Sequence, residues 1–106
     1  MPAVGDRLQQ LQQMLEKSPD DPFLLYGIAM EHKKSGEPER AIEFFERVIR
    51  LDPGYCYAYY QRGLVHESMG NPGAAKQSYR EGVKAAIDKG DAHAQGELQA
   101  ALDLVE

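Results

Sequence analysis

The chain has 106 residues, of which 42% are apolar, and its 12 Lys and Arg residues against 17 Asp and Glu residues give a net charge of -5. This length suffices for one domain, and the apolar content is that of an ordinary globular protein. The excess of acid and the lack of any run of basic residues argue against a nucleic-acid-binding surface, and no apolar stretch is long enough to cross a membrane.

Cys56 is the only cysteine of the chain, so no intramolecular disulfide can form. The N-terminal sequence MPAVGDRLQQ lacks the basic start and long apolar run of a secretory signal peptide. A lone cysteine is compatible with a reducing compartment. We therefore expect a cytoplasmic protein.

The sequence repeats itself with a period of 34 residues. Between the two full units, a shift by one period superposes five identical residues: Tyr26 on Tyr60, His32 on His66, Gly36 on Gly70, Pro38 on Pro72, and Ala41 on Ala75. A shift in the other direction carries Phe45 onto Leu11 and Pro53 onto Pro19. We expect a half unit over 6–21, full units over 22–55 and 56–89, and a terminal helix over 91–105.

Taken in chain order, the sequence predicts six helices, at about 6–17, 22–35, 38–51, 55–69, 72–88 and 91–105. No segment alternates between apolar and polar residues, so no strand is expected. The first helix opens with Asp6, and Gln9 follows three residues later, which resembles a capping box. The short loops favour antiparallel packing of successive helices.

The helices of the first full unit are bounded by caps and breakers. Asp20 and Asp21 are placed to cap the helix that Pro22 opens, and Gly36 can end it in the left-handed conformation. Pro38 opens the next helix, which the sequence around Pro53 ends.

The second full unit repeats this punctuation. Gly70 ends its first helix, Asn71 caps the second helix and Pro72 opens it. Gly90 and Asp91 then end that helix and begin the terminal one.

Apolar and small residues at spacings i, i+3, i+4 and i+7 define one buried face on each helix. The first helices of the units contribute Leu25, Ile28, Ala29 and His32, then Tyr59, Arg62, Gly63 and His66. Their partner helices contribute Ala41, Phe45, Val48 and Ile49, then Ala75, Tyr79, Gly82 and Val83. Small residues opposite large ones allow close helix approach. The terminal helix carries a similar stripe, Ala94, Leu98, Ala101, Leu102 and Val105, and we expect it to cover the last unit.

These residues resemble the tetratricopeptide repeat family, whose pattern combines an aromatic residue, Leu-Gly and Tyr on the first helix with Ala, Phe and Pro on the second. The first unit matches through Leu25, Ala29, Ala41, Phe45 and Pro53, and the second through Tyr59, Gly63, Ala75 and Tyr79. The resemblance covers residues 7–89. It implies an all-α fold in which helix pairs stack into a short right-handed superhelix with a concave groove, and a role in binding peptides or proteins.

The chain departs from the family pattern at several positions. His32 and His66 replace the usual Tyr, and Ile87 replaces the closing Pro. Arg62 stands where a buried Leu is usual, and we expect it to reach solvent along its aliphatic stem. Some family members hold a C-terminal carboxylate in a clamp of Lys, Asn and Arg. The corresponding positions here include Tyr26, Met30 and Gln61, so that clamp is not expected.

A second apolar stripe lies beside the core stripe on the two helices that would line the groove. Its members are Phe23, Tyr26, Met30, Tyr57, Tyr60 and Leu64, with Lys33, Lys34, Gln61 and Glu67 as a polar rim. One interpretation is an aromatic groove that takes apolar side chains of a partner. The other is that neighbouring helices cover these residues.

The residues with reactive or metal-binding side chains do not form a recognisable site. His32 and His66 would lie one helix spacing apart, about 8–10 Å, too far to share a metal ion. Cys56 has no base or cation nearby in sequence that would activate it. We therefore expect no metal, no cofactor and no catalytic activity.

The sequence predicts a monomeric, non-catalytic scaffold that binds another protein or a peptide segment, and neither nucleic acid nor membrane. The alternative is an assembly module in which the exposed stripe pairs with its own copy as a weak homodimer.

Overall fold

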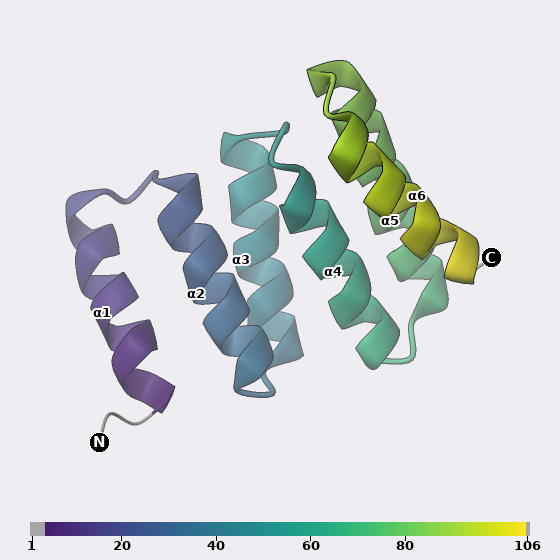
Figure 1. Cartoon of the computed structure of the whole chain (residues 1–106). Coiled ribbons are helices and arrows are strands. Elements are labelled where there is room, and N and C mark those ends of the chain that lie inside the picture. The colour runs from purple at the N-terminus through teal and green to yellow at the C-terminus, as the bar shows by residue number, and fades with distance from the viewer. Residues whose placement is uncertain (1–3, 106) are drawn as a thin grey trace.

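The computed structural model describes residues 4–105, and the regular structure in that span is entirely helical. The helices are α1 (Val4–Lys17), α2 (Pro22–Lys34), α3 (Pro38–Leu51), α4 (Cys56–Ser68), α5 (Pro72–Lys89) and α6 (Ala92–Val105). They form an antiparallel array in which α2, α4 and α6 lie in front of α3 and α5, with α1 beside α2 (Figure 1). The prediction of six helices in an all-α fold is confirmed.

Most of the predicted helix ends are observed. The carboxylate of Asp21 accepts a hydrogen bond of 2.9 Å from the Phe23 amide, and that of Asp91 accepts one of 3.0 Å from the Ala94 amide. Three glycines end helices with positive φ: Gly36 at 74°, Gly70 at 73° and Gly90 at 76°. Asn71 occupies the cap position of α5, but its side chain makes no capping hydrogen bond.

One further expectation about helix ends is wrong. Helix α1 begins at Val4, so Asp6 lies within the first turn and forms no capping box, although a carboxylate there still favours the helix dipole. Helix α5 ends at Gly90 as expected: it has 18 residues against 14 in α3 and continues to Lys89. The extra turn forms because Ile87 stands where Pro would interrupt the backbone hydrogen bonds.

The core forms where small residues of one helix meet large residues of the next. Phe45 and Tyr79 are fully buried, as the repeat predicted. A Cβ on Gly63 would lie 2.2 Å from Cε1 of Tyr79, and a Cβ on Gly82 would lie 2.7 Å from Cδ2 of Leu98. The absence of these Cβ atoms lets α4 pack on α5, and α5 on α6, at short distance.

Arg62 of α4 contradicts its expected position. It is only 9% exposed, and its guanidinium donates hydrogen bonds of 2.9 Å to Ser78 Oγ and 2.6 Å to Glu81 Oε1. Glu46 of α3 lies 3.8 Å away, and the ring of Tyr59 lies under the guanidinium. The side chain stays inside because these partners satisfy its charge, so it does not reach solvent along its stem.

Within residues 4–105, no helix combines the length and the apolar character needed to cross a bilayer.

Candidate functional site

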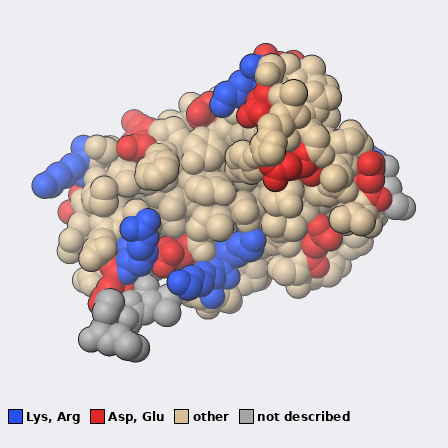
Figure 2. All heavy atoms as spheres, viewed as in Figure 1, with Lys and Arg blue, Asp and Glu red and all other residues tan. Residues whose placement is uncertain are grey.

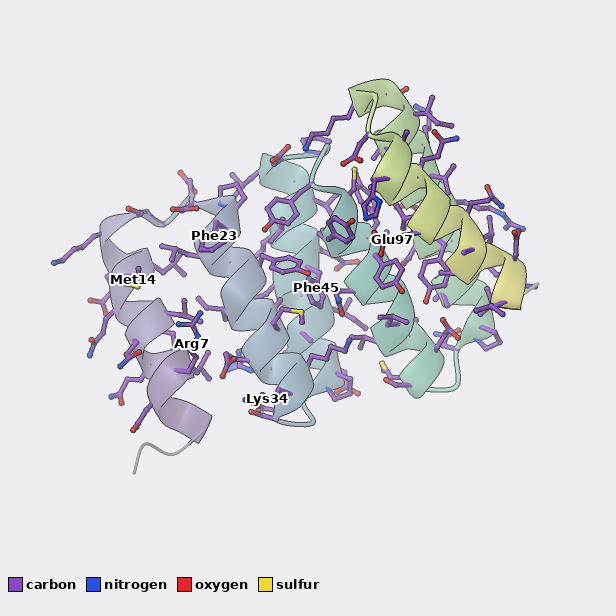
Figure 3. The ribbon with its side chains drawn as sticks, in the orientation of Figure 1. Arg7, Met14, Phe23, Lys34, Phe45 and Glu97 are labelled. Atoms are coloured by element: carbon purple, nitrogen blue, oxygen red, sulfur yellow. The ribbon has the colours of Figure 1, made fainter. Side chains whose placement is uncertain are left out.

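The surface that α2, α4 and α6 present away from α3 and α5 is here called the inner face (Figures 1 and 3). It carries the predicted groove residues. Phe23, near the start of α2, is 69% exposed, and Met30 on the same helix is half-buried. Tyr26 is half-buried between them, because its ring stacks on Tyr55 at a centroid distance of 5.0 Å. An edge contact of 5.7 Å with Phe45 connects Tyr26 to the core.

A polar bridge joins α2 and α4 on the inner face, near the C-terminal end of α2. Lys33 Nζ donates a hydrogen bond of 2.6 Å to Oε1 of Gln61. Gln61 is also hydrogen-bonded to Tyr26. Burial and the neighbouring Tyr55 raise the pKa of Tyr26 above its ordinary value, and the bond to Gln61 offsets only part of that rise. Burial lowers the pKa of Lys33, whereas neighbouring Lys34 is exposed. The bridge therefore holds a partly desolvated ammonium group beside the aromatic side chains.

The aromatic residues of α4 link the inner face to α6. The Tyr57 hydroxyl donates a hydrogen bond of 2.7 Å to Glu97, and this bond, with burial and the carboxylate charge, raises the pKa of Tyr57 to about 12. Tyr60 lies between the rings of Tyr57 and Tyr79, at centroid distances of 6.4 and 6.1 Å. Leu64 follows one turn later and is half-buried.

Glu67, predicted as part of the polar rim, has an internal partner. It accepts a hydrogen bond from the Tyr79 hydroxyl, which reaches it from the core. Burial and this bond together raise the pKa of Tyr79. Glu67 therefore satisfies a buried hydroxyl and is less available to a ligand than an unpartnered rim carboxylate.

Two hollows flank the centre of the inner face. The N-terminal hollow, between α1 and α2, has a volume of about 240 Å³, and the C-terminal hollow, between α4 and α6, has a volume of about 320 Å³. The N-terminal hollow is lined by Arg7, Leu11, Phe23, Tyr26, Met30 and Glu31, and the C-terminal hollow by Tyr60, Leu64, Glu67, Glu97, Ala100 and Leu104. Small-molecule sites span roughly 300–1,000 Å³; the N-terminal hollow lies below this range and the C-terminal hollow at its lower end, so both suit single side chains.

Comparison with known proteins identifies the fold. A sequence profile of the tetratricopeptide repeat matches residues 22–55, and a second profile of the same repeat matches residues 44–77. A tetratricopeptide repeat domain protein from Salinibacter ruber is 34% identical and superposes with a TM-score of 0.78 over 83% of this chain and 89% of that one. The chain belongs to the tetratricopeptide repeat (TPR) family.

Further TPR proteins match most of the chain. A TPR repeat-containing protein of Pseudomonas aeruginosa is 29% identical over 91 residues, which are 86% of this chain and 87% of that protein. The TPR2B domain of yeast Sti1, solved as a complex with pHsp70, superposes with a TM-score of 0.88 over 96% of this chain and 82% of that one. Its identity is 14%, so this likeness is one of fold.

Several residues of the inner face in this TPR chain escape prediction from the sequence. Glu97, Ala100 and Leu104 belong to α6, which was expected only to cover the last unit. Their spacing of i, i+3 and i+7 places them on one helix face, and that spacing was the available signal. Leu104 is 88% exposed there. Arg7 of α1 gives no comparable signal, because its position depends on how α1 meets α2.

His32 and Cys56 of this TPR chain contact neighbouring groups of the fold. His32 lies 3.1 Å from Glu37 and stacks on Phe44. Cys56 donates a hydrogen bond of 3.3 Å to the Gly54 carbonyl, and burial is the main factor that raises the pKa of its thiol. Across residues 4–105, no three His, Cys, Asp or Glu side chains lie together in a way that would hold a metal ion.

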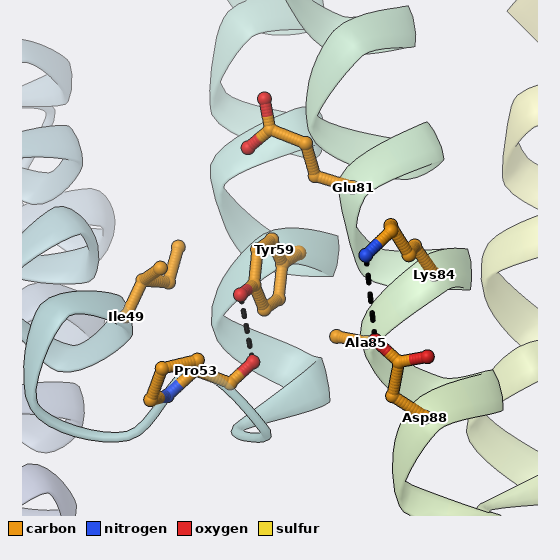
Figure 4. A pocket seen from close by; sticks show the side chains of 7 residues that line it. All are labelled: Ile49, Pro53, Tyr59, Glu81, Lys84, Ala85 and Asp88. Carbon is orange, nitrogen blue, oxygen red and sulfur yellow. Dashed lines mark hydrogen bonds and ion pairs between the residues drawn. The ribbon is translucent and has the colours of Figure 1, made fainter.

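A further pocket, of about 270 Å³, lies on the opposite, outer face between α3, α4 and α5 (Figure 4). Its polar groups bond to one another or to the core. The Tyr59 hydroxyl donates to the Pro53 carbonyl at 2.7 Å, and Lys84 lies 3.5 Å from Asp88. Glu81 is bound to Arg62. The structure therefore gives this outer pocket no polar group that requires a ligand.

Proposed function

We propose that this TPR chain is a non-catalytic adaptor whose inner face holds a segment of another protein. The observation that carries the proposal is the half-buried aromatic floor, Tyr26 with Tyr60, between two hollows of side-chain size. Aromatic residues at the centre of a surface, with polar groups around them, are typical of protein interfaces.

The fold supports the same role. The Sti1 domain, of the same fold, was solved as a complex with pHsp70. The exposed side chains at the two hollows, Phe23 and Leu104, offer apolar surface that this chain leaves unburied. Burial of such a side chain by a partner contributes roughly 1.5–3 kcal/mol.

A displayed library of random peptides tests the proposal directly. Peptides selected on the parent protein are measured by fluorescence polarisation against two double variants, Tyr26→Ala with Tyr60→Ala, and Phe23→Ser with Leu104→Ser. Each pair should weaken binding by about 2 kcal/mol or more, as loss of aromatic or apolar anchors does. The second pair replaces exposed side chains, so its effect is separable from a loss of folding.

Ile87→Ala is the matched control, because Ile87 is 55% exposed on α5 and belongs to neither hollow. It should leave peptide binding unchanged. Peptides that bind both double variants as tightly as the parent would place the binding surface elsewhere and would refute the proposal.

A second candidate is self-association through the same face, favoured by the exposure of Phe23 and Leu104. Sedimentation velocity over a wide range of protein concentration separates the two. A protein that stays monomeric at all concentrations supports the adaptor. A dimer that dissociates when Phe23→Ser is combined with Leu104→Ser supports the assembly module.

A further inference from the structure

We propose that the partner segment carries an internal Asp or Glu side chain, which docks on Lys33 while apolar side chains on either side of it enter the two hollows. This inference rests on the proposed function and specifies the chemistry of the ligand.

Basic side chains gather on the N-terminal half of the inner face, with acidic ones among them. Figure 3 places Arg7 on α1, Lys34 on α2 and Glu97 on α6, and Figure 2, in the same view, shows basic and acidic side chains together over α1 and α2 and mostly acidic ones around α6. The chain as a whole has a net charge of -5. A local group of cations on an acidic protein is a feature that complementarity with an anionic partner would explain.

The cations of this half have no acidic partner within residues 4–105. The ion pairs of those residues involve other side chains, and Arg7, Lys33 and Lys34 take part in none of them. The acids of the other half are already bound. Glu97 accepts from Tyr57 and lies 2.7 Å from Nε2 of His93, and Glu67 accepts from Tyr79. Glu31 lines the N-terminal hollow together with Arg7, so the positive charge that this half offers to a ligand is that of Lys33, whose ammonium group has no carboxylate partner within residues 4–105.

Lys33 is the best placed of the three cations to receive an anion. Its ammonium group is held by a single neutral acceptor, Gln61, at 2.6 Å, and burial lowers its pKa. An ammonium group has three donors, so donors remain for a carboxylate. A charge-assisted hydrogen bond at a partly desolvated site is stronger than the same bond in open water.

The surroundings of Lys33 favour a side-chain carboxylate over the carboxylate at a chain end. Lys33 bridges α2 and α4, and a hollow lies on each side of that bridge. A bound chain that fills both hollows must continue past Lys33 in both directions. A terminal carboxylate would stop at Lys33 and leave one hollow empty.

The spacing of the hollows sets the length of the segment. They lie about two helix spacings apart, roughly 20 Å if neighbouring axes are about 10 Å apart. An extended chain advances about 3.3 Å per residue. The two apolar residues should therefore be separated by about six positions, with the acidic residue between them.

Two libraries of random peptides, each of about 14 residues, test this inference. In one library the peptides are displayed inside a host loop with neither end free, and in the other they end in a free C-terminus. Selection on the parent protein should enrich Asp or Glu between two apolar positions in both libraries. The best internal peptide is then synthesised with blocked ends, together with its Gln or Asn counterpart.

Lys33→Gln should weaken the binding of the acidic peptide roughly tenfold, the loss expected for one charge-assisted hydrogen bond. The neutral counterpart should bind the parent roughly tenfold more weakly and should lose nothing further on Lys33→Gln. Lys84→Gln removes an equal charge from the outer face and should leave the affinity unchanged. Circular dichroism checks that each variant remains folded.

The other outcomes have separate meanings. Apolar peptides without an acid, weakened by Phe23→Ser and Leu104→Ser but not by Lys33→Gln, would overturn the inference and keep the proposed function. If Asp or Glu is enriched only beside a free C-terminus, the ligand group is not an internal side-chain carboxylate, and the inference is wrong. Peptides indifferent to all inner-face variants would overturn both proposals.

Discussion

Gly63 is a position where the fold depends on the absence of a side chain. A Cβ there would lie 2.2 Å from Cε1 and 2.7 Å from Cδ1 of Tyr79, whose ring is fully buried. The tyrosine cannot move aside without giving up its hydrogen bond to Glu67. We expect Gly63→Ala to lower the free energy of unfolding by about 1–3 kcal/mol, the usual cost of overpacking a core.

Gly96→Ala is the matched control for this prediction. Gly96 lies inside helix α6, and a Cβ there meets no atom within 4 Å. The substitution should stabilise the protein by about 0.5–1 kcal/mol, because alanine favours the helix without a clash. Urea denaturation measures both values. Equal effects of the two substitutions would contradict the contact between Gly63 and Tyr79.

His66 makes the stability depend on pH. Its Nδ1 atom is buried with no hydrogen-bond partner among residues 4–105, and its pKa lies below the ordinary 6.5 because of burial and the charge of Arg62, against a smaller opposing effect of Glu46. Below pH 6.5 the unfolded chain therefore binds a proton that the folded chain does not. Stability falls as the pH falls through that window.

The variant His66→Gln isolates this effect, because every other titrating group remains in place. The free energy of unfolding of the parent should decline more steeply than that of the variant between about pH 7 and pH 5, where histidine titrates. Urea denaturation at several pH values gives both slopes. Parallel curves would show that His66 contributes nothing to the pH dependence.

The extra turn of α5 is the element-level feature that distinguishes the second unit from the first. It ends at Gly90, where the amide of Asp91 donates to the Ala86 carbonyl at 2.9 Å, and α6 begins directly afterwards at Ala92. Ile87→Pro should remove this turn and cost about 3 kcal/mol or more, since Pro inside a helix loses a hydrogen bond and clashes with the preceding turn. Thermal melting followed by circular dichroism measures the loss.

Ile87→Ala controls for the side chain, which is 55% exposed. It should change the midpoint by little, because alanine keeps the backbone hydrogen bonds. A proline variant as stable as this alanine variant would show that the last turn of α5 contributes nothing to the placement of α6.

Element by element, the sequence predicted what local rules determine. The period of 34 residues, the glycines at Gly36 and Gly70 and the fully buried Phe45 are all consequences of spacing along one chain. The surroundings of Arg62 were not predictable in this way. Its partners come from α3 and α5, and only the packed array brings Glu46 and Glu81 to one guanidinium group.

The candidate site was predictable in part for the same reason. The aromatic stripe on α2 and α4 follows from helical spacing, whereas the bridge from Lys33 to Gln61 and the contact of Tyr57 with Glu97 join residues 28 and 40 positions apart. Such contacts depend on side-chain conformations across helices, which a repeat pattern does not specify. The second interpretation, in which neighbours cover the stripe, describes Tyr57 better than it describes Phe23.

At the scale of the whole molecule, each helix contacts mainly the helices next to it in sequence, as in other repeat proteins. The stability of each helix therefore depends mainly on its immediate neighbours, and the end helices have a neighbour on one side only. Helix α6 is nevertheless buried along one face, through Ala94, Leu98, Ala101 and Leu102. The same helix lines the C-terminal hollow with Leu104. The buried stripe and the exposed Leu104 lie on adjacent faces of α6, and Ala101 belongs to both the core and the lining of the hollow.

Deletion of residues 91–106 should test how much α6 contributes to the stability of the other helices. The deletion removes Leu98 and Leu102 from their contacts with α5 and α4, a loss of about 3–6 kcal/mol at roughly 1.5–3 kcal/mol per buried leucine. A domain of this size is stable by only about 5–15 kcal/mol in total, so the remainder should be marginally folded. The uncovered surface at Gly82 and Tyr59 is apolar, and the truncated chain should associate.

Thermal melting and sedimentation velocity measure the two effects of the deletion, on stability and on association. Leu104→Ser, which changes only the exposed face of α6, should retain the parent melting temperature and should associate no more than the parent does. A truncated chain that stays monomeric and melts with the parent would show that α6 is dispensable for the core, and its burial would then matter only for shaping the C-terminal hollow.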